Sequence, residues 1–86
     1  MALTRITPIP AQVSWDRRAD RPGVVRWADA ELTVRSLRAV RDERHAYRAD
    51  RGPRVTMVVQ ADRGEAALVF DARTARWFVE AVDLAA

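Results

Sequence analysis

Apolar residues occupy every second position from 55 to 61 of this 86-residue chain, and this alternation is the feature that most limits its fold. Val55, Met57, Val59 and Ala61 fall on one side of an extended segment, as the two-residue period of a β-strand requires. The turn Ala61-Asp62-Arg63-Gly64 follows, and its glycine supplies the left-handed position that a short hairpin loop needs. The pattern therefore predicts a β-hairpin.

Two further antiparallel strands are expected after this turn. Residues 65–70 place Ala66, Leu68 and Phe70 on one face. Residues 71–75 are typical of a second turn, and residues 76–82 predict a last strand that carries Trp77 and Phe78. The C-terminal half of the chain is thus expected to hold three consecutive strands.

The N-terminal part predicts shorter extended segments. Thr7-Pro8-Ile9-Pro10 should be extended, because proline disfavours the helical conformation of the residue before it. We expect residues 1–12 to form an N-terminal arm and residues 13–86 to form a single small β domain. Within that domain, short strands are expected at 13–15 and 24–27.

Residues 29–50 fit two secondary structures. A helix would have Asp29 as its N-cap and a Glu31–Arg35 pair at the favourable four-residue spacing. A strand would instead alternate Leu32 and Val34 with polar residues and then bulge near residues 36–37. We expect an all-β fold, a small antiparallel meander or SH3-like barrel of five to six strands. The alternative is an α+β fold with one helix within 29–50.

Arginine is the only strongly basic residue type, since the chain has no lysine, and it recurs through the centre of the sequence. Guanidinium groups suit phosphate and carboxylate because they are planar, forked and permanently charged. The spacing of three or four residues matches neither a helix nor one face of a regular strand, where odd spacings alternate between faces. The evenly spaced arginines are Arg35, Arg38, Arg41, Arg44, Arg48, Arg51 and Arg54.

We therefore expect only part of this series to reach one partner. Arg44, Arg48, Arg51 and Arg54 surround Tyr47 in sequence, and they are the predicted nucleic-acid or partner contacts. The other arginines are expected to be solvated.

No motif in the sequence predicts catalysis, a metal site or a cofactor. The chain has no cysteine, its only histidine is His45 in a charged segment, and its two serines, Ser14 and Ser36, lie outside any nucleophile motif. We predict no catalytic, cofactor-binding or metal-binding residues. No apolar run resembles a signal peptide or approaches the roughly 20 residues of a membrane span, so a cytoplasmic location without membrane contact is expected.

Several stretches resemble an uncharacterised family of small domains of GC-rich bacteria, found alone or appended to Y-family-like DNA polymerase proteins. The matching stretches are Val25-Arg26-Trp27, Leu32-Thr33-Val34 with Leu37, Leu68-Val69-Phe70-Asp71 and Arg76-Trp77-Phe78-Val79-Glu80. The resemblance covers residues 24–82 and implies mostly β structure and an association with DNA repair. The chain departs from the family pattern in lacking a glycine in the turn at residues 28–30.

Three functional hypotheses follow from these observations. The first is a non-enzymatic accessory module that binds nucleic acid, namely DNA, through the arginine-rich segment in a DNA-repair context. The alternative is a protein-interaction module, either for a repair protein or for a second copy of the chain as a homodimer, because exposed strand edges and aromatic patches favour pairing. An enzyme whose site only the fold assembles is the third, and no motif supports it.

Overall fold

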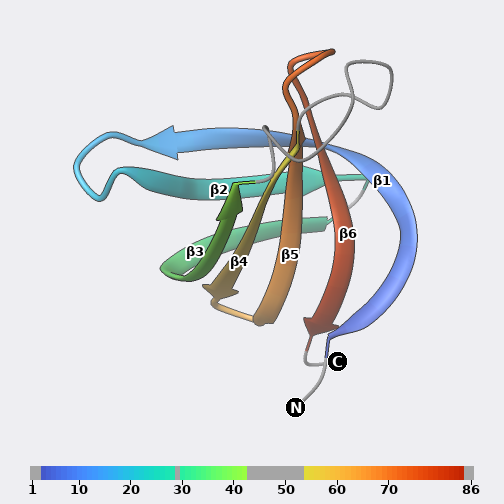
Figure 1. The fold of residues 1–86 in the computed structure, drawn as a ribbon. Helices are drawn as coiled ribbons and strands as arrows, with labels where there is room; N and C mark the ends of the chain where they lie inside the picture. The colour runs from blue at the N-terminus through green and yellow to red at the C-terminus, as the bar shows by residue number, and fades with distance from the viewer. Residues whose placement is uncertain (1–2, 29, 43–53, 85–86) are drawn as a thin grey trace.

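The computed structural model describes residues 3–28, 30–42 and 54–84. Within these ranges the chain forms six β-strands and no helix. Each strand pairs antiparallel with the next one along the chain, and β6 pairs with β1, so the sheet closes into a barrel (Figure 1). The strands are β1 (Thr4–Asp16), β2 (Arg21–Trp27), β3 (Ala30–Asp42), β4 (Arg54–Ala61), β5 (Gly64–Asp71) and β6 (Arg76–Leu84).

The predicted all-β meander is confirmed, with six strands in barrel order. The alternative helix is wrong for residues 30–42, which form β3, and the rest of its predicted range lies outside the described residues. The strand interpretation prevails because β3 finds partners on both sides, β2 and β4, which satisfy its backbone hydrogen bonds.

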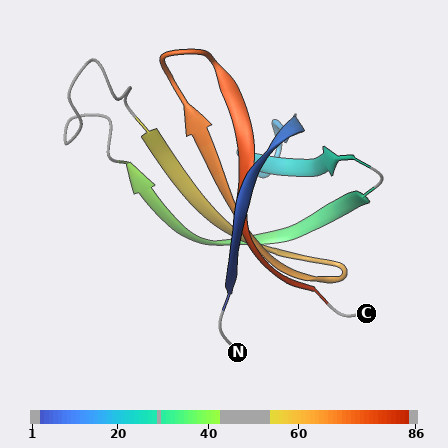
Figure 2. The same ribbon diagram turned by 90° about the vertical axis from the view of Figure 1, so that its right-hand side faces the viewer.

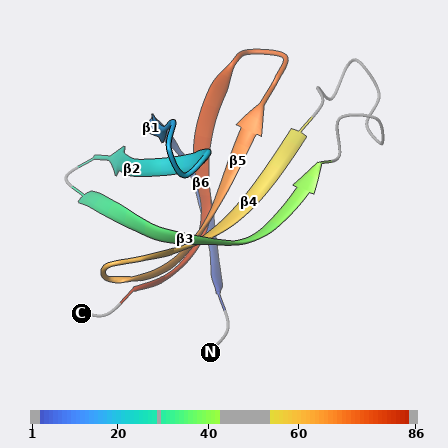
Figure 3. The same ribbon diagram turned by 90° about the vertical axis from the view of Figure 1, so that its left-hand side faces the viewer.

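Two long strands, β1 and β3, turn the corners of the barrel. β1 pairs with β6 up to Ala11 and with β2 from Gln12 onward. β3 pairs with β2 up to Thr33 and with β4 from Val34 onward. Figures 2 and 3 show β3 curving from β2 toward β4. The barrel therefore consists of two sheets that share these two bent strands.

The predicted N-terminal arm is not separate from the barrel. Residues 4–12 are extended, as expected, but they belong to β1 and pair with β6 and β2. Pro8 is accommodated because the register shifts between Arg5 and Ile9, which leaves this residue in an irregular stretch of the ladder. Closure of the barrel depends on this segment.

The corner in β3 is held by the side chain of Arg21, which begins β2, and by Asp62, which lies in the turn after β4. The register shifts between Val34 and Ser36, which frees backbone carbonyls from the regular ladder. The Arg21 guanidinium donates hydrogen bonds to the carbonyl oxygens of Val34 at 3.1 Å and Arg35 at 3.0 Å. Beyond it, Asp62 both donates its N–H to the Thr33 carbonyl and accepts the Thr33 N–H through Oδ1. These bonds satisfy the polar backbone where β3 changes partner.

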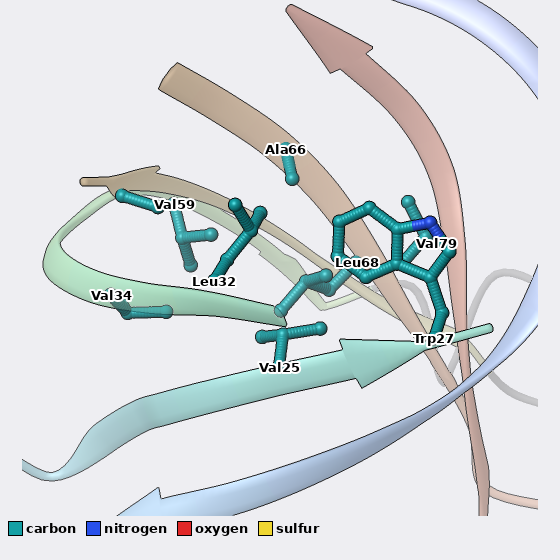
Figure 4. Packing of buried hydrophobic residues seen from close by; sticks show 9 residues of the cluster. Val25, Trp27, Leu32, Val34, Val59, Ala66, Leu68 and Val79 are labelled. Atoms are coloured by element: carbon teal, nitrogen blue, oxygen red, sulfur yellow. The ribbon is translucent and has the colours of Figure 1, made fainter. Parts of the chain in front are cut away.

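The barrel interior is filled by aliphatic side chains and one indole. Leu32, Leu68 and Val79 are fully buried, and the ring of Trp27 lies beside the last two (Figure 4). Trp77 is half-buried against this cluster, and its ring packs on Phe70 with 5.1 Å between the centroids. Trp27 thus belongs to the core cluster and Trp77 packs at its border, whereas Trp15 is 44% exposed.

The tight turns have the backbone conformations that their lengths require. Gly64 has φ of 140°, which confirms the predicted positive-φ position after residues 62–63. Between β2 and β3, where the family pattern has glycine, Ala28 takes φ of 46°. Two other turns use carboxylates: Asp16 Oδ1 accepts the N–H groups of Arg18 and Ala19, and Asp71 Oδ1 accepts the Arg73 N–H.

Replacing Gly64 should strongly destabilise the barrel. A Cβ at this position would lie 2.0 Å from the Asp83 carbonyl oxygen, which is a backbone atom. We expect Gly64→Ala to lower the free energy of unfolding by more than about 2 kcal/mol, because the positive φ alone costs on the order of 1–3 kcal/mol. Gly23→Ala is the control, since its nearest contact is a side-chain atom 3.2 Å away. Equal urea midpoints for the two variants would contradict this account.

Removing the Arg21 side chain should loosen the corner of β3. The guanidinium bonds the carbonyls of Pro22, Val34 and Arg35, so Arg21→Leu leaves them without these partners. We expect urea denaturation to show that the free energy of unfolding falls by about 2 kcal/mol. Arg17→Leu, in the exposed turn before β2, should change stability by less than about 0.5 kcal/mol. A similar loss in both variants would show that the corner does not depend on Arg21.

Candidate nucleic-acid interface

Three arginines of β3 project from the outer face of the barrel because the strand is irregular at two places. The register shifts between Val34 and Ser36 and again between Leu37 and Ala39, so Arg35 and Arg38 are each an extra residue. One residue in each interval of three is the extra residue of a register shift. The remaining two residues complete one repeat of the strand, so the next arginine returns to the same face. Successive arginines lie about 7 Å apart along the strand.

The pairing register shows that this face is the outer one. Arg41 lies opposite Thr56, Thr56 opposite Val69, and Val69 opposite Phe78. Their sequence neighbours Leu68 and Val79 point into the core, so this row points outward. The expectation that a strand would throw alternate arginines to opposite faces is therefore wrong for residues 35–41.

The three β3 arginines differ in whether a carboxylate neutralises their charge. Arg38 Nη1 contacts Glu65 Oε1 at 2.7 Å. Arg35 and Arg41 are exposed, and their guanidinium groups make no ion pair or hydrogen bond with any residue that the structure describes. Two cations of the same face thus remain available to an anionic partner.

A second cluster on this outer face consists of the Glu80 carboxylate of β6 and two arginines that contact it. Glu80 Oε1 contacts Arg5 Nη2 at 3.2 Å and Arg54 Nη2 at 3.4 Å. Glu80 is the extra residue of the register shift between β5 and β6, since Ala67 faces Ala81 and Leu68 faces Val79. Arg5 is 81% exposed, so its pair with Glu80 is screened by water and adds little stability.

A shallow groove of about 210 Å³ lies beside this cluster. Phe78, Val69 and Pro8 form its apolar lining, while the charged lining comes from strand ends and the middle of β6. The Asp71 carboxylate at one side also caps the following turn, because its Oδ1 accepts the Arg73 N–H at 2.9 Å. The complete lining consists of Pro8, Arg54, Val69, Asp71, Phe78 and Glu80.

A second hollow, of about 410 Å³, lies across β1 and β2 and has a different character. Its arginine, Arg26, already contacts Glu31 at 3.5 Å, and its lining holds no carboxylate. The combination of aromatic, cationic and anionic groups occurs in the groove at Phe78.

The predicted contact residues are only partly placed. Arg54 begins β4 and lines the groove, in an ion pair with Glu80. Arg44, Tyr47, Arg48 and Arg51 lie outside the described residues. The sequence analysis missed the shared face of Arg35, Arg38 and Arg41, and the signal that could have found it was the bulge expected near residues 36–37.

The part of the chain that the structure describes holds no candidate metal site. No group of three or more histidine, cysteine or acidic side chains is placed there to hold a metal ion. Within the same ranges, no helix is long and apolar enough to cross a membrane.

Comparison with known proteins does not place the chain in a family: no family model, no curated protein and no solved structure matches it.

Proposed function

We propose that the protein is a non-enzymatic module that binds single-stranded nucleic acid through the outer face of β3 to β6. The observation that carries the proposal is the alignment of Arg35, Arg38 and Arg41 on one face of β3, with two of the three lacking an ion pair among the described residues. A row of cations that tracks the backbone is the main requirement for binding a strand without sequence preference.

The groove at Phe78 supports a single strand over a duplex. Bases in a duplex are stacked and paired, so their faces cannot reach an aromatic ring on a protein surface. An unpaired base can lie on such a ring, and stacking of this kind adds about 1–3 kcal/mol per base. Arg54 stands between the arginine row and the groove and could contact the strand at both.

A DNA-repair role follows from the family resemblance alone and stays a prediction, as does the absence of enzymatic activity. The homodimer is the competing hypothesis, and Trp15 and Val40 are the large apolar side chains most exposed among the described residues. They belong to different strands, and neither of the two grooves described above includes them. The arginine row therefore favours the nucleic acid.

Binding should be strongly salt-dependent and should require the β3 arginines. We expect a labelled dT15 oligonucleotide to bind at 50 mM salt in fluorescence anisotropy. Arg38→Gln/Arg41→Gln should weaken this binding and reduce the slope of log K against log salt by about 0.7, since each single-strand phosphate contact contributes about 0.7 and Arg38 is already paired with Glu65.

The control removes the same charge elsewhere. Arg17→Gln/Arg18→Gln also lowers the formal net charge from +3 to +1, but it changes the turn between β1 and β2, away from the C-terminal end of β3 (Figure 1). We expect it to keep the salt slope of the unchanged protein. Equal losses in the two double variants, or no binding at 50 mM salt, would refute the proposal. If the free protein sediments as a dimer and the dimer does not bind dT15, the homodimer hypothesis is favoured instead.

A further inference from the structure

We propose that the groove at Phe78 is a subsite for one unstacked base and that it selects bases with an exocyclic amino group, such as cytosine, over thymine and uracil. This inference rests on the proposed function and adds a base preference to it. The juxtaposition that carries it is an aromatic ring with two carboxylates and one guanidinium around the same groove.

The floor of the groove is suited to the face of a base. Phe78 is half-buried on the outer side of β6, beside the buried Val69 of β5, and Pro8 of β1 also lines the groove. Phe78 is absent from the barrel's core cluster, so its ring is not needed to fill the interior. Apolar lining of this kind accepts the face of any base, and it supplies affinity without choosing among bases.

The rim of the groove supplies the selection. Glu80 Oε1 receives both arginine contacts, and Oε2 has no partner in the described parts of the chain. Asp71 adds a second carboxylate at the rim. Carboxylate oxygens accept hydrogen bonds and cannot donate them, so they favour a ligand edge that carries N–H groups.

Cytosine matches this rim better than thymine does. Its amino group N4–H₂ donates, and its neighbouring ring nitrogen and carbonyl oxygen accept, which pairs a carboxylate and the Arg54 guanidinium with complementary atoms. Thymine presents the O4 oxygen where cytosine has N4–H₂, and that oxygen would face a carboxylate. Both are pyrimidines, so ring size does not separate them.

The groove and the arginine row can serve the same strand. Arg41 and Phe78 lie in one cross-strand row, on β3 and β6. Three strand spacings separate them, about 14 Å, since neighbouring strands are about 4.8 Å apart. An extended nucleotide and the long Arg41 side chain together can span this interval, with the phosphate toward β3 and the base toward β6.

The test compares dC15 with dT15 on the full chain by fluorescence anisotropy. We expect dC15 to bind about fivefold more tightly, which corresponds to about 1 kcal/mol. Asp71→Asn should abolish or invert this preference. Asparagine can keep the bond from the Arg73 N–H through its Oδ1, which leaves the amide NH₂ to donate to thymine O4.

Aromatic variants separate the subsite from the arginine row. Phe78→Leu should weaken binding of both oligonucleotides about tenfold and leave the salt slope unchanged, because stacking involves no counterions. Trp15→Leu is the matched control, since Trp15 is an exposed aromatic near the end of β1 and outside the groove. It should bind both oligonucleotides like the unchanged protein.

Each outcome decides between the two proposals. Equal affinity for dC15 and dT15 with a steep salt slope would overturn the base preference and leave the proposed function standing. Unchanged affinity in Phe78→Leu, with its folding verified by circular dichroism, would likewise overturn the subsite. Absence of binding to either oligonucleotide at 50 mM salt would remove both.

Discussion

The bend in β3 is the constraint on which the rest of the barrel depends. At Thr33 and Val34 the strand leaves β2 and joins β4, and a regular ladder cannot make this change without exposing backbone polar groups. The register shift provides the bend, while Arg21 and Asp62 bond the groups that it frees. With this corner in place, the six strands can close without a free edge.

The same irregularities give the outer face its charge. Without the two shifts, Arg38 would alternate to the side opposite Arg35 and Arg41. With them, the three side chains share one surface, and Glu65 and Glu80 neutralise part of the charge around it. The proposed binding surface is thus a consequence of how the barrel closes, so stability and binding depend on the same stretch of chain.

Much of the fold was predictable from local patterns. The alternation at 55–61, the turn ending in Gly64 and the last two strands all appear in the structure, because period-two burial and turn chemistry act over a few residues. The incorporation of residues 4–12 into β1 was not predictable, since its partner β6 lies about 70 residues away in sequence. Of the predicted contact residues, only Arg54 falls within the described chain, at the edge of the groove.

The sequence by itself determined that the C-terminal half of the chain is built of strands and that the strongly basic groups of the chain are all guanidinium. Only the tertiary structure decided where β1 and β3 change partners and which side of the barrel the arginines occupy. The physical reason is that the pairing register with the neighbouring strand decides to which side of the sheet each side chain points. One extra residue reverses every later side chain, and local composition does not reveal where that residue is inserted.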